Sequence, residues 1–161
     1  MISDWEQRVA QFWATADDSQ VELSLAQMKS LVEELDQENP DGMFEWASVH
    51  DFLGLELQAI PLYERALDLG LVGLKREKAL IQLASSLRNV GRPEDAIAIL
   101  EENEFGDETF LASRAFLALA MFDAGKPSEA LRQTLENLYP SDALYARSIL
   151  FYARQLPEGK S

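Results

Sequence analysis

The chain has 161 residues, of which 47% are hydrophobic and 26% charged, a balance typical of a folded globular domain. It contains no Cys and a single His, His50, which excludes disulfides, thiolate nucleophiles and Cys- or His-rich metal sites. The start of the chain lacks the basic flank and apolar core of a signal peptide, and no apolar run approaches the roughly 18 residues of a membrane span. We therefore expect a soluble, cytoplasmic protein.

The net charge of −14 is concentrated in the N-terminal part. Residues 1–70 hold 15 Asp/Glu and 3 Lys/Arg, a balance of −12, whereas residues 71–161 hold 13 and 11. Such a charge repels nucleic-acid backbones and anionic membrane surfaces, so we expect neither as a partner. It is compatible with a basic partner, although solubility alone is the commoner reason for an acidic surface, and both interpretations stay open.

Two helices are predicted before residue 40. The first carries an apolar stripe at helical spacing, formed by Trp5, Val9, Phe12, Trp13 and Ala16. A second stripe runs from Val21 to Leu35, and we expect its helix to end near Asn39-Pro40-Asp41-Gly42. We interpret residues 1–39 as a degenerate leading helix pair that covers the first complete repeat, because terminal repeats need a more polar outer face.

Three segments then align on a recurring pattern of small residues, at about 40–73, 74–107 and 108–139. The turn glycines Gly54, Gly91 and Gly125 are 37 and 34 residues apart, close to the roughly 34-residue period of repeated helix pairs. Each glycine is expected to end a first helix in a left-handed cap, and Pro93 and Pro127 to start the second helices that follow. Small residues at matching positions should let the two helices of each pair approach closely: Ala47, Ala84 and Ala118 on the first helices, Ala59, Ala96 and Ala130 on the second.

A last helix is predicted to start at Pro140-Ser141-Asp142 and to cap the stack over residues 140–156, with a frayed tail at 157–161. Its inward-facing residues by pattern are Leu144, Ile149, Leu150, Tyr152 and Ala153. The expected fold is therefore all-α: a right-handed α-solenoid of antiparallel helix pairs, about nine helices in one domain.

The residues of the repeats resemble those of a known protein family. The runs Ala59–Leu67, Ile81–Arg92 and Phe116–Gly125 are similar to bacterial tetratricopeptide repeat proteins of the "group 5" type, and the resemblance covers about residues 20–155. It implies a superhelix of stacked helix pairs whose first helices line a concave groove for an extended or helical peptide. The motifs are specific for the fold and do not identify a partner.

Carried over onto this sequence, the resemblance implies a set of groove residues in three successive repeats. The first repeat would present Phe44, Glu45, Ser48, Asp51 and Phe52, the second Lys78, Gln82, Ser85, Arg88 and Asn89, and the third Ala115, Leu119 and Phe122. Apolar anchors with a few oriented polar groups are typical of peptide-binding grooves. We therefore take this set as the candidate peptide-binding site.

Arg88 and Asp51 occupy the same repeat position in adjacent repeats, which suggests two interpretations. The favoured one is a structural ion pair that fixes the register of the repeats. The alternative is that Arg88, with Asn89, Gln82 and Lys78, receives a carboxylate or backbone carbonyl of a partner.

No catalytic constellation is recognisable in the sequence. His50 alternates with apolar residues and is expected to be packed and hydrogen-bonded, and adjacent carboxylates such as Glu33-Glu34 mark a solvated face. Without a nucleophile–base pair we expect no enzyme, no cofactor and no metal. The leading hypothesis is a non-enzymatic protein- or peptide-binding scaffold. The alternatives are a dimer formed through exposed faces of the terminal helices, and a small acidic chaperone of the secretion type.

Overall fold

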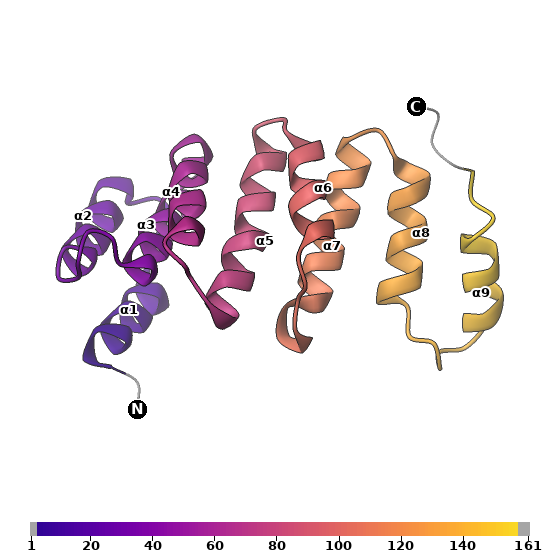
Figure 1. The fold of residues 1–161 in the computed structure, drawn as a ribbon, viewed down its shortest axis with the longest axis horizontal. Coiled ribbons are helices and arrows are strands. Elements are labelled where there is room, and N and C mark those ends of the chain that lie inside the picture. Colours follow the sequence, from indigo (N-terminus) through magenta and orange to yellow (C-terminus); the bar gives the residue numbers. More distant parts are fainter. Residues whose placement is uncertain (1–2, 158–161) are drawn as a thin grey trace. The chain divides into compact units, whose positions relative to one another are not determined.

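The computed structural model describes residues 3–157, and this part of the chain is all-α, as predicted (Figure 1). It divides into two compact units, the first ending at Ser86 and the second beginning at Leu87. The boundary lies within a helix of the second predicted repeat. In the described residues the nine helices are α1 Asp4–Thr15, α2 Val21–Val32, α3 Pro40–Phe52, α4 Glu56–Asp68, α5 Gly73–Asn89, α6 Pro93–Glu102, α7 Asp107–Asp123, α8 Pro127–Leu138 and α9 Ala146–Ala153.

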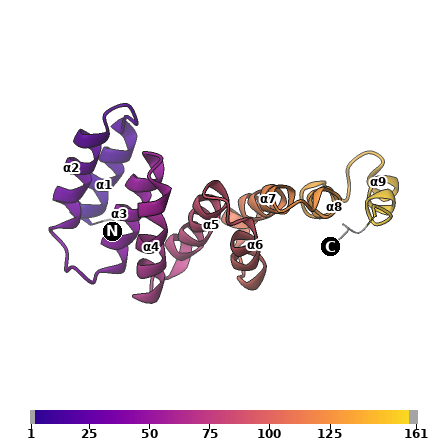
Figure 2. The ribbon, with the colours of Figure 1, turned by 90° about the horizontal axis from the view of Figure 1, so that it is seen from above.

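The first unit packs α1 on α2, α2 on α3 and α3 on α4 (Figure 2). Helix α1 begins with a capping box, in which Ser3 and Glu6 each accept a hydrogen bond from the backbone of the other. The apolar stripes predicted for α1 and α2 meet α3 in a core built on the buried Phe12, Met28 and Val49. Burying these stripes is what holds the leading helix pair against the first repeat.

The boundary between α2 and α3 differs from the prediction. Helix α2 ends at Val32, and α3 begins at Pro40, within the segment predicted to end the preceding helix. Asn39 caps α3, since its side-chain oxygen accepts hydrogen bonds from two first-turn N–H groups at 3.0 and 3.1 Å. Two acidic residues, Glu33 and Glu34, follow α2 directly, where the negative end of the helix dipole disfavours them.

The turn glycines behave as predicted. Gly54, Gly91 and Gly125 have φ angles of +70°, +79° and +75°, the left-handed region that glycine adopts without penalty. In each turn the next residue donates its N–H to a carbonyl five residues back, the bond of a Schellman cap: Leu55 to His50, Arg92 to Leu87 and Lys126 to Met121. Pro93 and Pro127 occupy the first turns of α6 and α8. The three repeats therefore share one helix-ending device.

The small residues on the second helices are buried as expected, Ala59, Ala96 and Ala130 being at most 7% exposed. On the first helices Ala47 and Ala84 are buried, whereas Ala118 is half-buried and lines a cavity between α7 and α8. Ala118 lies on the side of α7 that faces α8, although it is less buried than Ala47 and Ala84.

The last helix also differs from its prediction. It begins at Ala146, after the turns of residues 140–145 and a left-handed Tyr145 with φ +64°. Ala146 and Ala153, seven residues apart, set the inward face, with Ile149 and Leu150 half-buried between them. Leu144 precedes the helix and is 76% exposed, and Tyr152 is 65% exposed, so their inward placement was wrong. Of the predicted tail, residues 158–161 lie outside the described residues.

Candidate functional site

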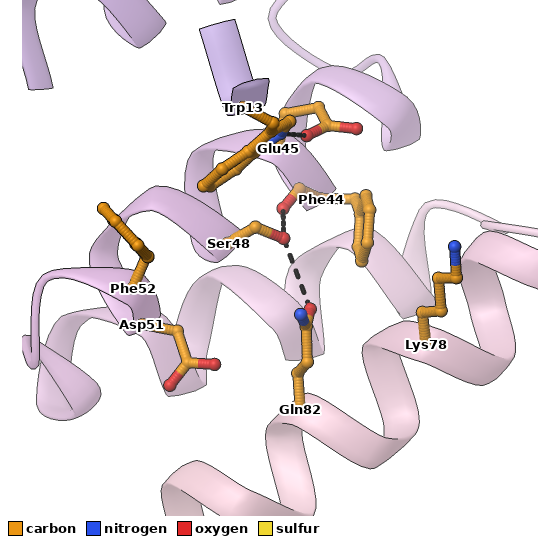
Figure 3. A pocket seen from close by; sticks show the side chains of 8 residues that line it. All are labelled: Trp13, Phe44, Glu45, Ser48, Asp51, Phe52, Lys78 and Gln82. Carbon is orange, nitrogen blue, oxygen red and sulfur yellow. Dashed lines mark hydrogen bonds between the residues drawn. The ribbon is translucent and has the colours of Figure 1, made fainter. Parts of the chain in front are cut away.

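Seven of the predicted groove residues lie around one cavity of about 380 Å³ in the first unit (Figure 3). Helix α3 contributes five of them and α5 two, and Trp13 of α1 completes the wall. We call this the first-unit cavity. Its lining residues are Trp13, Phe44, Glu45, Ser48, Asp51, Phe52, Lys78 and Gln82.

Helical spacing and the repeat length together bring these side chains to one place. Phe44, Ser48 and Phe52 follow one another at intervals of four on α3, and so do Lys78 and Gln82 on α5. Two contacts between these helices join residues 34 apart: Ser48 Oγ lies 3.3 Å from Gln82 Oε1, and Lys75 Nζ lies 2.7 Å from Asp41 Oδ1. The repeat period thus sets the register in which α5 faces α3.

A buried tyrosine organises the polar floor of the cavity. Tyr63 of α4 is fully buried, and its hydroxyl donates to Gln82 Oε1 at 2.8 Å. The Ser48 hydroxyl donates to the Phe44 carbonyl at 2.8 Å and also faces Gln82 Oε1 (Figure 3). Because the amide oxygen of Gln82 accepts from the Tyr63 hydroxyl, its Nε2–H₂ group is left to donate to a ligand. Burial raises the pKa of Tyr63, which therefore remains a donor at neutral pH.

Two carboxylates line the cavity, and burial raises the pKa of both. Glu45 is only 5% exposed, and the Trp13 indole donates to its Oε2 at 2.8 Å, which opposes part of the burial effect on its pKa. The pKa of Asp51 is raised by burial against the lowering effect of the Ser86 hydroxyl, which donates to its Oδ1 at 2.8 Å. The carboxylate of Glu45 therefore accepts a hydrogen bond from α1, and that of Asp51 accepts one from α5.

Trp13, predicted only as part of the apolar stripe of the first helix, lines the cavity, which the sequence did not indicate. The helical periodicity of α1 shows that Trp13 is at least partly buried, but the contact with Glu45 joins residues 32 positions apart. No signal in the sequence places the leading helix pair against α3 in this orientation. The ring of Trp13 also packs edge to face against Phe52, with ring centres 5.8 Å apart.

The remaining residues predicted for the second repeat do not line this cavity. Ser85 is half-buried, and Asn89 is exposed at the end of α5. The predicted pair of Arg88 with Asp51 is wrong: Arg88 pairs with Asp123, and Asp51 accepts from Ser86. Both observed contacts join residues 35 apart, whereas Asp51 and Arg88 are 37 apart. The extra residues before α5 therefore shift the aligned positions out of contact.

The residues predicted for the third repeat line a different cavity, in the second unit. It measures about 550 Å³ between α7 and α8, and apart from Thr134 its lining residues are apolar. Leu119 and Phe122 are 46% and 64% exposed there, and Ala115 lies beside them. We call this the second-unit groove. Its lining residues are Ala115, Ala118, Leu119, Phe122, Pro127, Ala130, Leu131, Thr134 and Leu138.

The single histidine is packed, as predicted. Its Nδ1 lies 2.7 Å from the Trp46 carbonyl, and its ring packs edge to face against the Trp46 ring at 4.5 Å. Within residues 3–157 no three His, Asp or Glu side chains are grouped so that they could hold a metal ion. None of the helices in this part of the chain combines the length and apolar character needed to cross a membrane.

The family model described as "Tetratrico peptide repeat" (TPR_5) matches residues 40–156. The chain belongs to the tetratricopeptide repeat family. Tetratricopeptide repeats typically bind other proteins or peptides and act as non-enzymatic scaffolds. The match begins at the first residue of α3, so α1 and α2, and with them Trp13, lie outside it. Comparisons with curated proteins and with solved structures find no significant match.

Proposed function

We propose that this tetratricopeptide repeat protein is a scaffold without catalytic activity whose first-unit cavity binds an extended peptide segment of a partner protein. The observation that supports this most is the combination of Gln82 and its aromatic surroundings. Gln82 offers an amide donor fixed by Tyr63, and Phe44, Phe52 and Trp13 surround it with apolar surface. A backbone carbonyl of a bound peptide matches the donor, and an adjacent side chain matches the rings.

The polar groups of the cavity favour a ligand with both donors and acceptors. Gln82 and Lys78 donate, whereas Glu45 and Asp51 accept. A peptide backbone carries both kinds of group in every residue, so it can satisfy these side chains where an apolar ligand would leave them unpaired.

Selection from a phage-displayed library of random dodecapeptides tests this proposal. Peptides recovered on the wild-type chain are synthesised, and their affinities are measured by fluorescence anisotropy. We expect Gln82→Ala and Phe52→Ala each to weaken the selected peptides by about tenfold, which corresponds to roughly 1.4 kcal/mol.

The control is Gln58→Ala, which removes the same side chain from an exposed position of α4 outside the cavity. It should leave the affinity unchanged, and circular dichroism should show native helicity for all three variants. Peptides whose affinity is indifferent to Gln82→Ala and Phe52→Ala would rule out this cavity as the binding site.

A second candidate function is self-association through the second-unit groove. The large apolar side chains Leu119, Phe122 and Leu131 are 46–64% exposed around it, and apolar patches of this kind are typical of protein–protein contacts. Light scattering at micromolar concentration should then give about twice the monomer mass, and Phe122→Asp should return it to the monomer mass. A monomeric wild type would exclude this candidate.

A further inference from the structure

The first-unit cavity has an uneven charge. The carboxylates of Glu45 and Asp51 line it, and Lys78 is the single cation among its lining residues. The unit around it is acidic as well, since residues 1–86 hold 16 Asp/Glu and 6 Lys/Arg, a balance of −10. Low-dielectric walls concentrate such a field inside a cavity, so a positively charged group is the favoured occupant.

Glu45 favours a ligand that can donate a hydrogen bond. It is 5% exposed, and in the described part of the chain its hydrogen bond from Trp13 engages only Oε2. Because no buried side-chain N or O atom of the described residues lacks a hydrogen-bond partner, Oε1, which accepts no such bond, is accessible to solvent. A ligand that fills the cavity lined by Glu45 and excludes solvent from Oε1 must donate a hydrogen bond in its place.

The aromatic side chains that line the cavity favour an arginine over a lysine side chain. Trp13, Phe44 and Phe52 line the cavity beside the carboxylates, and the Trp13 indole is held in place by its bond to Glu45 (Figure 3). A guanidinium group is planar and weakly hydrated, stacks on aromatic faces and donates a fork of hydrogen bonds to carboxylates. A lysine ammonium is a compact, strongly hydrated charge that uses such walls less well.

We propose that the first-unit cavity takes an arginine side chain of the bound peptide, with Glu45 and Asp51 accepting its hydrogen bonds and the aromatic rings packing on its plane. The inference rests on the proposed function in that the arginine belongs to a peptide. Side chains that are apolar or acidic are excluded, because they leave Oε1 of Glu45 without a donor or add a like charge beside it.

The probe for this inference is the tripeptide acetyl-Ala-Arg-Ala-amide, titrated into ¹⁵N-labelled protein. Binding is followed by the indole N–H resonance of Trp13, which is assigned through its loss in Trp13→Phe. The matched probe replaces Arg by citrulline, which keeps the shape and removes the charge. We expect the arginine tripeptide to bind at least about tenfold more tightly, as for loss of a charge-assisted hydrogen bond. Equal affinities would overturn the inference.

Isosteric variants identify the groups responsible. Glu45→Gln and Asp51→Asn should each weaken the arginine tripeptide about tenfold, whereas Lys78→Ala should tighten it, because a competing cation is removed. Glu64→Gln and Asp68→Asn make the same charge changes on the exposed surface of α4, and screening should keep their effect below about twofold. If these surface variants act as strongly as Glu45→Gln, the attraction is unspecific and the cavity is not an arginine site.

The two proposals fail separately. If the selected dodecapeptides require Gln82 and Phe52 but the arginine and citrulline tripeptides bind with equal affinity, the arginine site is refuted and the peptide-binding function stands. Binding of the arginine tripeptide at Trp13, combined with the absence of any selected peptide that depends on Gln82, would refute the extended-peptide function and leave the arginine site standing.

Discussion

The hydroxyl of Tyr63 lies 2.8 Å from Oε1 of Gln82, and this hydrogen bond joins α4, the second helix of the first repeat, to the floor of the first-unit cavity. Tyr63 is fully buried on α4, whereas Gln82 lines the cavity from α5. The bond assigns the amide oxygen as acceptor and so leaves the amide nitrogen for a ligand. Tyr63 therefore orients Gln82, although only Gln82 is expected to contact the ligand.

Tyr63→Phe should lower both stability and peptide affinity. Loss of the hydroxyl removes one buried hydrogen bond, which costs about 0.5–1.5 kcal/mol of unfolding free energy in urea denaturation. The Gln82 amide loses its orienting donor, so the affinity of selected peptides should fall by about three- to tenfold. Tyr139→Phe is the control, because it removes a 2.8 Å hydrogen bond to the Leu144 carbonyl in the second unit. It should leave peptide affinity unchanged, and an equal loss in both variants would contradict this role of Tyr63.

Glu45→Gln should alter the pH dependence of stability. Burial raises the pKa of Glu45 in the folded state above its ordinary value of 4.5, so the folded protein binds this proton more tightly than the unfolded chain. The stabilisation is complete below pH 4.5 and is lost as the pH rises through the raised pKa. The glutamine variant lacks this loss, because its amide stays neutral and can still accept from Trp13.

Urea unfolding between pH 4 and pH 7.5 measures this effect. The unfolding free energy of Glu45→Gln minus that of the wild type should become more positive as the pH increases. A difference that stays constant over this range would show that the pKa of Glu45 is not raised by folding. Glu64→Gln, on the exposed surface of α4, supplies the matched control.

The ion pair of Arg88 with Asp123 should contribute to stability and not to binding. The two side chains are 24% and 37% exposed, so a double-mutant cycle with Arg88→Ala and Asp123→Ala should give a coupling of about 0.5–1 kcal/mol that decreases in high salt. The affinity of selected peptides should be the same in Arg88→Ala and in the wild type. A loss of affinity without a loss of stability would restore Arg88 to the peptide-binding site.

Gly91→Ala should destabilise the chain through its backbone alone. Gly91 has a φ of +79°, and no heavy atom lies within 4 Å of the position that a Cβ would take. The cost of roughly 1–2 kcal/mol therefore comes from the left-handed conformation and not from a clash. Gly91→Asn should recover much of this loss, since Asn tolerates that region, and thermal unfolding compares the two variants. Equal destabilisation by Ala and Asn would show that a contact, and not φ, requires glycine here.

Local signals in the sequence predicted the framework well. Gly54, Gly91 and Gly125 lie where left-handed caps are needed, and Pro93 and Pro127 lie where their helices begin. These positions depend on backbone preferences of single residues, so the sequence is sufficient to find them. The start of α9 was misplaced because Pro140-Ser141-Asp142 is an equally good turn sequence, and only packing of Ala146 and Ala153 decides where the helix begins.

The candidate site was predictable only as far as the repeat alignment reaches. Phe44, Ser48 and Gln82 line one cavity because residues about one repeat period apart on α3 and α5 lie close together. Trp13 lies outside the family match, and its contact with Glu45 depends on how the leading helix pair packs. Arg88 was misassigned because contacts follow an offset of 34–35 residues, whereas alignment on the glycines uses 37 at this point.

The most direct test of the first-unit cavity as the peptide site is a ¹H–¹⁵N correlation spectrum of the chain with a selected dodecapeptide added. The indole N–H of Trp13 and the side-chain amide of Gln82 should shift with saturation, and the indole of Trp5, which donates to the Leu31 carbonyl outside this cavity, should not. Unchanged Trp13 and Gln82 resonances at saturating peptide, with shifts confined to the backbone amides around Leu119 and Phe122, would contradict the account and place binding in the second-unit groove.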